Sequence, residues 1–349
     1  MSDPQVRPRV SVIIPAYRAE ESLPRIVEQL MAQTVRPFEV ILVCDGVADE
    51  TPDVAASLSR LHDSVVALVL PENVGVARAR DAGVRSVQGD FVLFLDADDT
   101  MPETAIEHLA GAAETTSSDV VIGQASALLP DGRLDYAIAA PVGTGTVSGV
   151  AAFSLLLRGT VTGHLWNKLV RLSVLEQCLP FAVSEVHSDL SIVARVMSRA
   201  RTVTFVDQPV YTYHATPGSI LKSGRRRGAS LDVIAGVVRE SADLVDARLA
   251  TSSDYRYFVL KHIGLSRLKD AVLGPYDAAT SARLASDARR ALSWRDLPPA
   301  LRLRDARTAA TLIIAKISLS LYRRLMTRGR DSTGSRSHRI MDIVAKESV

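Results

Sequence analysis

Four acidic and small residues follow an apolar run that has the composition of a buried strand. The run FVLFL leads directly into Asp96-Ala97-Asp98-Asp99. Aspartates one residue apart, where a strand ends and the chain turns, can direct both carboxylates into one crevice. Such oxygens suit Mn²⁺ or Mg²⁺, and the metal would neutralise charge on a departing diphosphate. The tetrapeptide alone also fits a turn in which Asp99 or Thr100 caps the next helix. Its position after a buried strand favours the metal site.

A second carboxylate and two arginines have the chemistry of a nucleotide site. Asp45 ends the run EVILVC, and it can accept a hydrogen bond from a pyrimidine N–H or serve as an Asp-Gly turn residue. The stretch NVGVARARDAG opens a helix and presents Arg78 and Arg80. A helix N-terminus with nearby cations favours a diphosphate. Because residues two apart do not share a helix face, we expect only one of these arginines to face the site.

A possible general base lies before the helical run LSIVARV. Asp189 follows Ser188 there and can take the proton from an acceptor hydroxyl, with Glu185 in reserve. The alternative is that Ser188 or Asp189 simply caps the helix. No G-x-S-x-G motif supports a nucleophilic serine.

Two further segments could contact substrate. In HLWNK, Trp166 beside Lys168 would suit a sugar or a phosphate, and the alternative is a packed tryptophan with a surface lysine. His214, in YTYHATPGS, follows a strand and could reach the metal or the diphosphate, although a lone histidine is more often structural.

Strands and helices alternate through the first 125 residues, which predicts βαβ units and an α/β fold with a mainly parallel sheet flanked by helices. The strands read as nearly all apolar, as expected where both faces are covered. Ligands of such sheets bind beyond the carboxyl ends of the strands, where Pro15-Ala16-Tyr17, Asp45 and Asp96 would converge. Strands are expected at 10–15, 39–44, 65–70, 91–96, 119–123 and 203–207, and helices at about 20–33, 52–62, 75–88, 102–116 and, weakly, 148–158.

The rest of the chain has a different pattern. Residues 126–165 read as a connection rich in Gly and Ala, and from about 229 apolar residues recur three and four apart. We therefore expect a nucleotide-sugar-binding catalytic domain over 1–222, a basic linker over 223–228, a helical domain over 229–325 and a basic, disordered tail over 326–349.

Composition limits the function classes. The 349 residues carry a formal charge of +2, but residues 301–349 hold 11 Lys or Arg against 4 Asp or Glu. That segment could contact an anionic membrane face, with Leu312, Ile313, Ile314, Ile317 and Leu321 on the apolar side of an amphipathic helix. Nucleic-acid binding is not expected, because aromatic residues do not interleave with the basic ones. Two distant cysteines and no apolar signal segment predict a cytoplasmic protein, at most peripheral to the inner membrane face.

These motifs, taken in order, resemble the inverting family-2 glycosyltransferases with a GT-A (Rossmann-like) fold. The likeness covers about residues 8–222 and lies in SVIIPAYRAEESL, VCDGVADET, NVGVARARDAG with GDFVLFLDADD, WNKLVR, HSDLSIVARV and QPVYTYHATPGSI. The layout is also similar to polymer-decorating members such as wall teichoic acid glycosyltransferases. The resemblance implies a sugar donor linked to UDP and an acceptor that is a polysaccharide, a teichoic acid or a lipid-linked glycan.

The resemblance also implies roles for individual residues. Asp98 would be the main metal ligand and Asp189 the inverting base, and Asp96 would meet the ribose or a metal-bound water. The nucleotide-sugar pocket would comprise Pro15, Ala16, Tyr17, Asp45, Arg80, Asp96 and Ala97.

The chain departs from the family pattern at Ser188, where the family usually has Glu; Cys44 and Val47 are smaller departures. The missing glutamate leaves the acceptor class open and motivates one alternative, a catalytically silent carbohydrate-binding or scaffold protein. A nucleotidyltransferase is the other, although IIPAYRAEE lacks that class's glycine-rich and basic signature. A homo-oligomer is left open.

Overall fold

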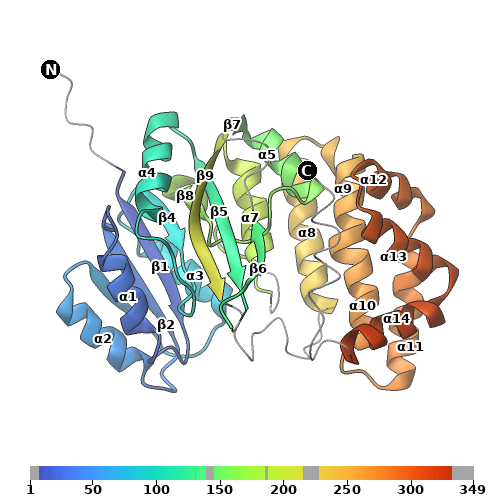
Figure 1. The fold of residues 1–349 in the computed structure, drawn as a ribbon, viewed down its shortest axis with the longest axis horizontal. Helices are drawn as coiled ribbons and strands as arrows, with labels where there is room; N and C mark the ends of the chain where they lie inside the picture. The colour runs from blue at the N-terminus through green and yellow to red at the C-terminus, as the bar shows by residue number, and fades with distance from the viewer. Residues whose placement is uncertain (1–7, 130, 139–144, 185–187, 215–227, 332–349) are drawn as a thin grey trace.

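The computed structural model describes residues 8–129, 131–138, 145–184, 188–214 and 228–331. A single nine-stranded sheet lies at the centre of the N-terminal part (Figure 1). Its strands are β1 (Val10–Ala16), β2 (Glu39–Asp45), β3 (Val65–Leu70), β4 (Phe91–Phe94), β5 (Val120–Leu128), β6 (Leu134–Ile138), β7 (Gly145–Ser148), β8 (Lys168–Arg171) and β9 (Thr202–His214). Their order is β3-β2-β1-β4-β8-β5-β9-β7, and β6 pairs with β5.

Six of the nine strands run in one direction. The strands β1 to β4 are paired in parallel, and β9 is parallel to β5. Because β8 is antiparallel to both β4 and β5, these two strands also run the same way. The exceptions are β6, β7 and β8. The expected mostly parallel α/β sheet is therefore confirmed.

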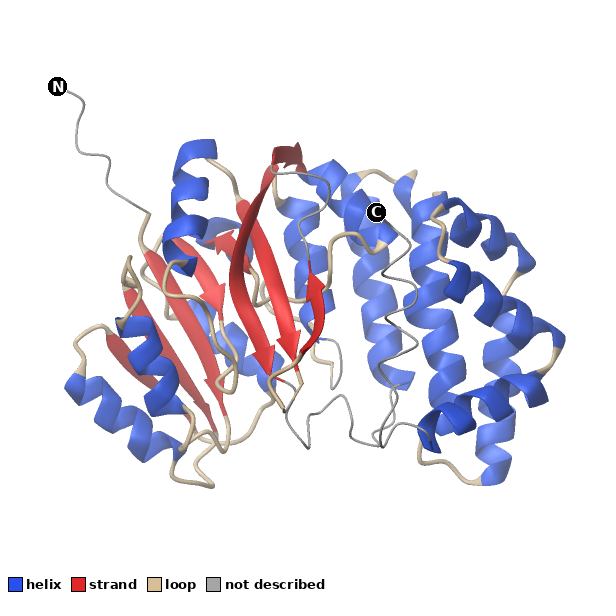
Figure 2. Ribbon diagram, in the orientation of Figure 1, coloured by secondary structure: helices blue, strands red, loops and turns tan. Residues whose placement is uncertain are grey.

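Helices cover both faces of the sheet (Figure 2). One apolar cluster takes Val12, Ile14 and Leu42 with α1 (Leu23–Met31), α2 (Thr51–Leu61) and α4 (Ala105–Thr116). The other takes Ile13 and Val43 with α3 (Val76–Arg85), α5 (Gly149–Arg158) and α7 (Ser188–Arg199). Alternate residues of one strand thus enter opposite layers, which explains why these strands are apolar throughout.

The segment expected to be a connection contains three elements. The weak helix expected near 148–158 forms as α5, and β6 and β7 precede it. Both strands are largely exposed and short, so neither has the apolar alternation that would reveal a strand in the sequence. The third missed strand, β8, joins β4 to β5 and is treated below because it carries Lys168.

The C-terminal region is helical, and its first helix belongs to the same core as the sheet. Leu231, Ile234 and Val238 of α8 pack in the cluster that contains α5 and α7. A second core, which includes Leu268, Leu312 and Tyr322, holds the later helices together. The α-helices of the whole C-terminal region are α8 (Gly228–Val245), α9 (Ser253–Phe258), α10 (Leu265–Leu273), α11 (Ala278–Ala291), α12 (Leu297–Arg302), α13 (Ala306–Ile317) and α14 (Leu319–Asp331).

The expected boundaries between the parts fall mainly on residues outside the described ranges. This holds for the end of the catalytic domain at 222 and for all of the basic linker except Gly228, which begins α8. The last helix continues to Asp331, six residues past the expected end of the helical part at 325. The remaining tail, 332–349, lies outside the described residues.

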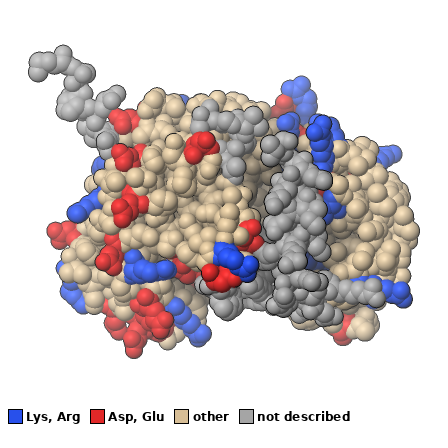
Figure 3. All heavy atoms as spheres, viewed as in Figure 1, with Lys and Arg blue, Asp and Glu red and all other residues tan. Residues whose placement is uncertain are grey.

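Within the described ranges, no helix has the length and apolar character needed to cross a bilayer. On the face shown in Figure 3, acidic side chains gather over the α1–α2 side, whereas lysine and arginine stand out around the C-terminal helices. Cys44 and Cys178 are buried, and neither forms a disulfide.

Candidate active site

The carboxyl ends of β1, β2 and β4 meet at one edge of the sheet. β1 lies between the other two, with Ala16 beside Cys44 and Ile13 beside Phe94. The residues that follow these positions are the predicted polar clusters. Tyr17 is 46% exposed, whereas Ala16 is buried and Pro15 is half-buried. Tyr17 is thus the side chain of this group that offers a free surface to a ligand.

Asp45 fastens the loop that begins α3. Its two carboxylate oxygens accept hydrogen bonds from the backbone N–H groups of Val74 (2.7 Å) and Gly75 (3.0 Å). Gly75 has φ 85°, a left-handed conformation that favours glycine. Asp45 is therefore a fixed part of the loop, and each oxygen has a lone pair left for a ligand. Recognition of a base by Asp45 stays a prediction.

Arg80 is the arginine that faces the site, and Arg78 is exposed, in line with the expectation that only one of them would turn inward. The Arg80 side chain is 3% exposed. Its two terminal nitrogens contact different carboxylates, Asp96 at 3.0 Å and Asp189 at 2.5 Å. Its Nε has no hydrogen-bond partner among the described residues. Arg80 thus joins a residue after β4 to a residue in the first turn of α7.

Asp189 is held by three groups. Arg80 contacts Oδ1, the Ser188 hydroxyl donates to the same oxygen at 3.4 Å, and the backbone N–H of Leu165 donates to Oδ2 at 3.3 Å. Burial opposes ionisation, but the Arg80 charge and the hydrogen bonds from Arg80 and Leu165 outweigh it and hold the pKa of Asp189 below its ordinary value. The carboxylate is therefore ionised at neutral pH, as a general base must be.

Asp99 does not cap the next helix, contrary to the interpretation of it as a capping residue. The N-cap of α4 is Thr104. Asp99 is fully buried and accepts hydrogen bonds from the Tyr211 hydroxyl and from the backbone N–H of His214 (2.8 Å). Burial raises the pKa of Asp99 to about 8. Asp99 therefore anchors the 96–99 loop to β9, a role that its neighbours in sequence do not reveal.

Asp98 and His214 are the two residues predicted to bind a metal. The Asp98 side chain is exposed, and its backbone carbonyl accepts from Arg25 at 3.1 Å. Burial and Arg25 lower the pKa of His214, and the charge of Asp98 acts in the opposite direction. The ring of His214 also contacts Thr100 Oγ1 at 2.8 Å. The described residues contain no cluster of three or more His, Cys, Asp or Glu side chains able to hold a metal. The chemistry of Asp98 and His214 fits a divalent ion only if a ligand such as a diphosphate completes the set.

Trp166 and Lys168 are both buried. The Trp166 ring is stacked between His164 (centroids 4.7 Å apart) and Tyr211 (4.3 Å), and it is 5% exposed. Lys168 is fully buried. Neither side chain offers a surface to a sugar or a phosphate in this structure, so the exposed aromatic platform does not form. Glu185, the reserve base, lies outside the described residues.

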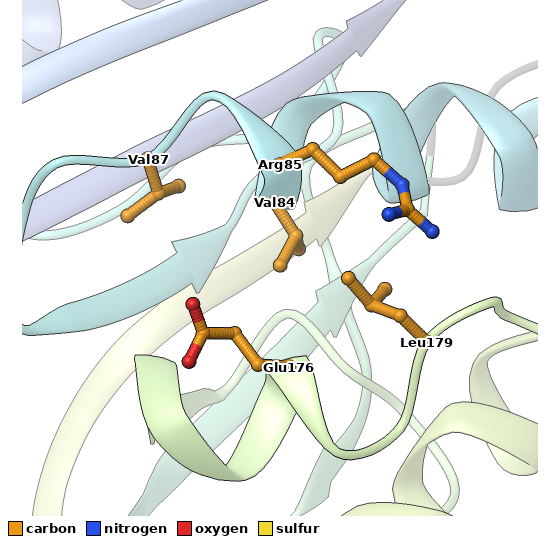
Figure 4. Close-up of a pocket in the computed structure, with 5 residues that line it drawn as sticks. All are labelled: Val84, Arg85, Val87, Glu176 and Leu179. Atoms are coloured by element: carbon orange, nitrogen blue, oxygen red, sulfur yellow. The ribbon is translucent and has the colours of Figure 1, made fainter.

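Two surface hollows lie away from these residues. The larger, of about 530 Å³, is at the C-terminal end of α3, beside α6 (Leu172–Glu176) (Figure 4). The smaller, of about 380 Å³, lies between α1 and α2. No residue predicted for the site lines either hollow. The lining of the larger hollow comprises Val84, Arg85, Val87, Glu176 and Leu179.

Comparisons with known proteins identify a similar family over part of the chain. Residues 11–136, which include Asp45, Arg80, Asp96 and Asp98, match the family described as Glycosyl transferase family 2. A cholesterol galactosyltransferase of Borreliella burgdorferi is 27% identical over 224 residues, 62% of each chain. A putative glycosyltransferase of Bacillus subtilis, EpsH, is 28% identical over 225 residues, 63% of this chain and 64% of its own. The aligned segments thus span less than two thirds of these relatives.

A solved structure extends the likeness to nearly the whole chain. Staphylococcus aureus TarS, crystallised in complex with UDP-GlcNAc, superposes with a TM-score of 0.69 and covers 93% of this chain and 92% of its own. At 17% identity, the superposition is evidence of a shared fold that includes the C-terminal helices. Residues 11–136 are thus similar to glycosyltransferase family 2, and the chain as a whole has a GT-A fold of the kind seen in TarS, followed by a helical C-terminal region.

Proposed function

We propose that this protein is an inverting glycosyltransferase that moves a sugar from a nucleotide diphosphate-sugar to a hydroxyl group of an acceptor. One observation carries the proposal: the buried Arg80 holds the ionised Asp189 beside Asp96, at the edge of the sheet where ligands of α/β folds bind. A single displacement requires one general base and stabilisation of the leaving group. Asp189 would be the base at this edge.

In the proposed reaction the acceptor O–H bond breaks and its proton passes to Asp189. The acceptor oxygen attacks the anomeric carbon as the bond to the nucleoside diphosphate breaks, and the electron pair leaves with the diphosphate. Because the attack comes from the face opposite the leaving group, an α-linked donor gives a β-linked product. General base catalysis of this kind typically contributes about 10²- to 10⁴-fold to the rate.

A divalent metal, Mn²⁺ or Mg²⁺, would be held by Asp98 with His214 beside it. When bound, it would supply charge that stabilises the departing diphosphate. Arg80, with one nitrogen already on Asp96, would add a fixed positive charge near the same group.

UDP-sugars are the proposed donors. The support is the carboxylate of Asp45, which retains acceptor capacity beside the exposed Tyr17, and the similarity of fold to a protein crystallised with UDP-GlcNAc. The proposed acceptor is a polysaccharide, a teichoic acid or a lipid-linked glycan. A relative whose name specifies cholesterol as its substrate favours acceptors found at membranes.

Peripheral contact with the inner face of the cell membrane is the proposed location. Leu312, which was expected on the apolar side of the amphipathic helix, is fully buried in the C-terminal core and cannot face lipid. Ile317, Leu321 and Leu325 are 43–68% exposed, and Arg324 is exposed among them. Replacing Leu321 and Leu325 with serine should reduce sedimentation with anionic phosphatidylglycerol vesicles. Equal sedimentation of this variant and the wild type would contradict the proposed contact.

The function is tested by measuring UDP release from a panel of UDP-sugars with Mn²⁺, followed by turnover with candidate glycan acceptors. Transfer supports the proposal, and binding without release in the presence of acceptors identifies a silent carbohydrate-binding protein. Release of pyrophosphate from a nucleoside triphosphate and a sugar phosphate would instead identify a nucleotidyltransferase.

A further inference from the structure

One peptide group lies between the buried amine of Lys168 and the proposed base. Lys168 Nζ donates a hydrogen bond to the carbonyl oxygen of His164 at 2.5 Å. The N–H of the same peptide unit, that of Leu165, donates to Asp189 Oδ2 at 3.3 Å. The Lys168 amine and the Asp189 carboxylate are thus connected through the two ends of a single amide.

The lysine end of this connection is rigidly placed. Lys168 is the first residue of β8 and is fully buried, and its Nζ also donates to Asn167 Oδ1 at 2.8 Å. Asn167 is fixed in turn by two hydrogen bonds with the backbone of Gly123 in β5, at 2.8 and 3.0 Å. Among the described residues, no carboxylate forms an ion pair with Lys168. Burial lowers the pKa of Lys168 to about 7, and the charge of Asp189 acts in the opposite direction. A buried amine without a direct counterion is costly, which suggests a task beyond packing.

We propose that Lys168 is a positioning residue that acts on Asp189 through the His164–Leu165 peptide group; this inference rests on the proposed function of Asp189. The hydrogen bond from the Lys168 amine to the carbonyl oxygen polarises the amide and makes its N–H a stronger donor, most of all when the amine is protonated. The stronger N–H fixes Oδ2 of Asp189, while Arg80 occupies Oδ1. Lys168 therefore sets the orientation of the base without touching the substrate.

The sequence allows this peptide group to be observed almost alone. Only two His-Leu pairs occur in the chain, His164-Leu165 and His108-Leu109. Labelling histidine with ¹³C at the carbonyl and leucine with ¹⁵N therefore gives two carbonyl–amide signals, and the second, in α4, is an internal control. In Lys168→Met, we expect the His164 carbonyl and Leu165 amide shifts to change and the control signal to stay. An unchanged His164-Leu165 signal would overturn the proposal.

Kinetics separate positioning from simple packing. In Lys168→Met, kcat for UDP release should fall about tenfold to a hundredfold, while the Kd for UDP stays within about twofold, because only the base is misplaced. In an Asp189→Asn background the same substitution should have no further effect on kcat, since Lys168 acts through Asp189. Additive losses would indicate a structural role and contradict the proposal. Lys316→Met is the matched control, because Lys316 also donates to a backbone carbonyl, that of Leu292 at 2.9 Å, far from the site in sequence.

Two outcomes distinguish this inference from the proposed function. If no UDP-sugar is turned over but the His164-Leu165 signal moves, the function fails and the contact stands. If the wild type is active and Lys168→Met keeps full kcat, the function stands and the positioning role is wrong. Should Lys168→Met fail to fold, Lys168→Gln, which retains a donor, replaces it in both experiments. If the wild type is active and Lys168→Gln leaves the His164-Leu165 signal unshifted or keeps full kcat, the positioning role is likewise wrong.

Discussion

The guanidinium of Arg80 contacts Asp189 at 2.5 Å and Asp96 at 3.0 Å, and so one buried cation serves two carboxylates from distant parts of the chain. The Arg80 side chain is 3% exposed, whereas Asp96 and Asp189 are 35% and 22% exposed. The cation is therefore shielded from water, and both anions keep an open side. This geometry leaves each carboxylate accessible to a ligand while its position is fixed from behind.

Removing the Arg80 charge should destabilise the fold. In Arg80→Met, two carboxylates lose their counterion, and we expect a loss of about 2–3 kcal/mol in the free energy of unfolding, less than for fully buried pairs because both anions retain solvent contact. Urea denaturation provides the measurement. Arg78→Met is the matched control, because Arg78 is exposed on the same helix. Equal stability of the two variants would contradict the role assigned to Arg80.

The pH dependence of activity follows from the lowered pKa of Asp189. The base must be ionised, so kcat should increase with pH on an acid limb and then level off. Because the pKa in the folded protein is below the ordinary value of 3.8, this limb should lie below that value, and the stability contributed by Asp189 is likewise lost only as pH falls through the lowered pKa. In Arg80→Met, the Arg80 charge no longer offsets the effect of burial, so the pKa of Asp189 should rise and the acid limb of the kcat–pH profile should move to higher pH. A kcat–pH profile that is unchanged in this variant would argue against the coupling.

Asp45 should support the nucleotide loop even without a ligand. Asp45→Ala removes the acceptor of two backbone N–H groups, which we expect to cost about 1–2 kcal/mol of stability and to weaken UDP binding. Chemical denaturation and calorimetry measure the two effects. The control is Asp53→Ala, since Asp53 is exposed on α2. If both variants bind UDP as tightly as the wild type does, Asp45 plays no part in the donor site.

The metal assignment predicts a selective defect. Asp98→Ala should remove the Mn²⁺-dependent part of UDP binding and leave the fold intact, because the Asp98 side chain is exposed. Calorimetry with and without Mn²⁺ separates the metal-dependent part of UDP binding from the metal-independent part. Mn²⁺ enhancing UDP binding equally in the variant and the wild type would exclude Asp98 as a ligand.

Much of the fold could be predicted because its strands are buried on both faces. Apolar runs such as 10–15 and 39–44 coincide with β1 and β2 to within a residue. The short strands β6 and β7 could not be found, since their exposed side chains give no hydrophobic pattern. That Asp45 and Asp96 lie at the same edge of the sheet followed from parallel strand order alone.

Contacts between distant segments were beyond the reach of the sequence. Local spacing indicates that one of Arg78 and Arg80 faces inward, but not that Arg80 reaches Asp189. In the same way, Asp99 reads as a helix cap until β9 brings Tyr211 to it. Lys168 reads as a surface cation until β8 is found between two strands of the sheet, where its side chain is buried.

The most direct test of the central claim compares Asp189→Asn with the wild type in UDP-sugar turnover and UDP binding. The control is Asp63→Asn, an exposed carboxylate far from the sheet edge that carries the site. We predict that Asp189→Asn lowers kcat by about 10²- to 10⁴-fold with UDP affinity within about threefold of the wild type, and that the control is unaffected. Wild-type turnover in Asp189→Asn would contradict the assignment of Asp189 as the base.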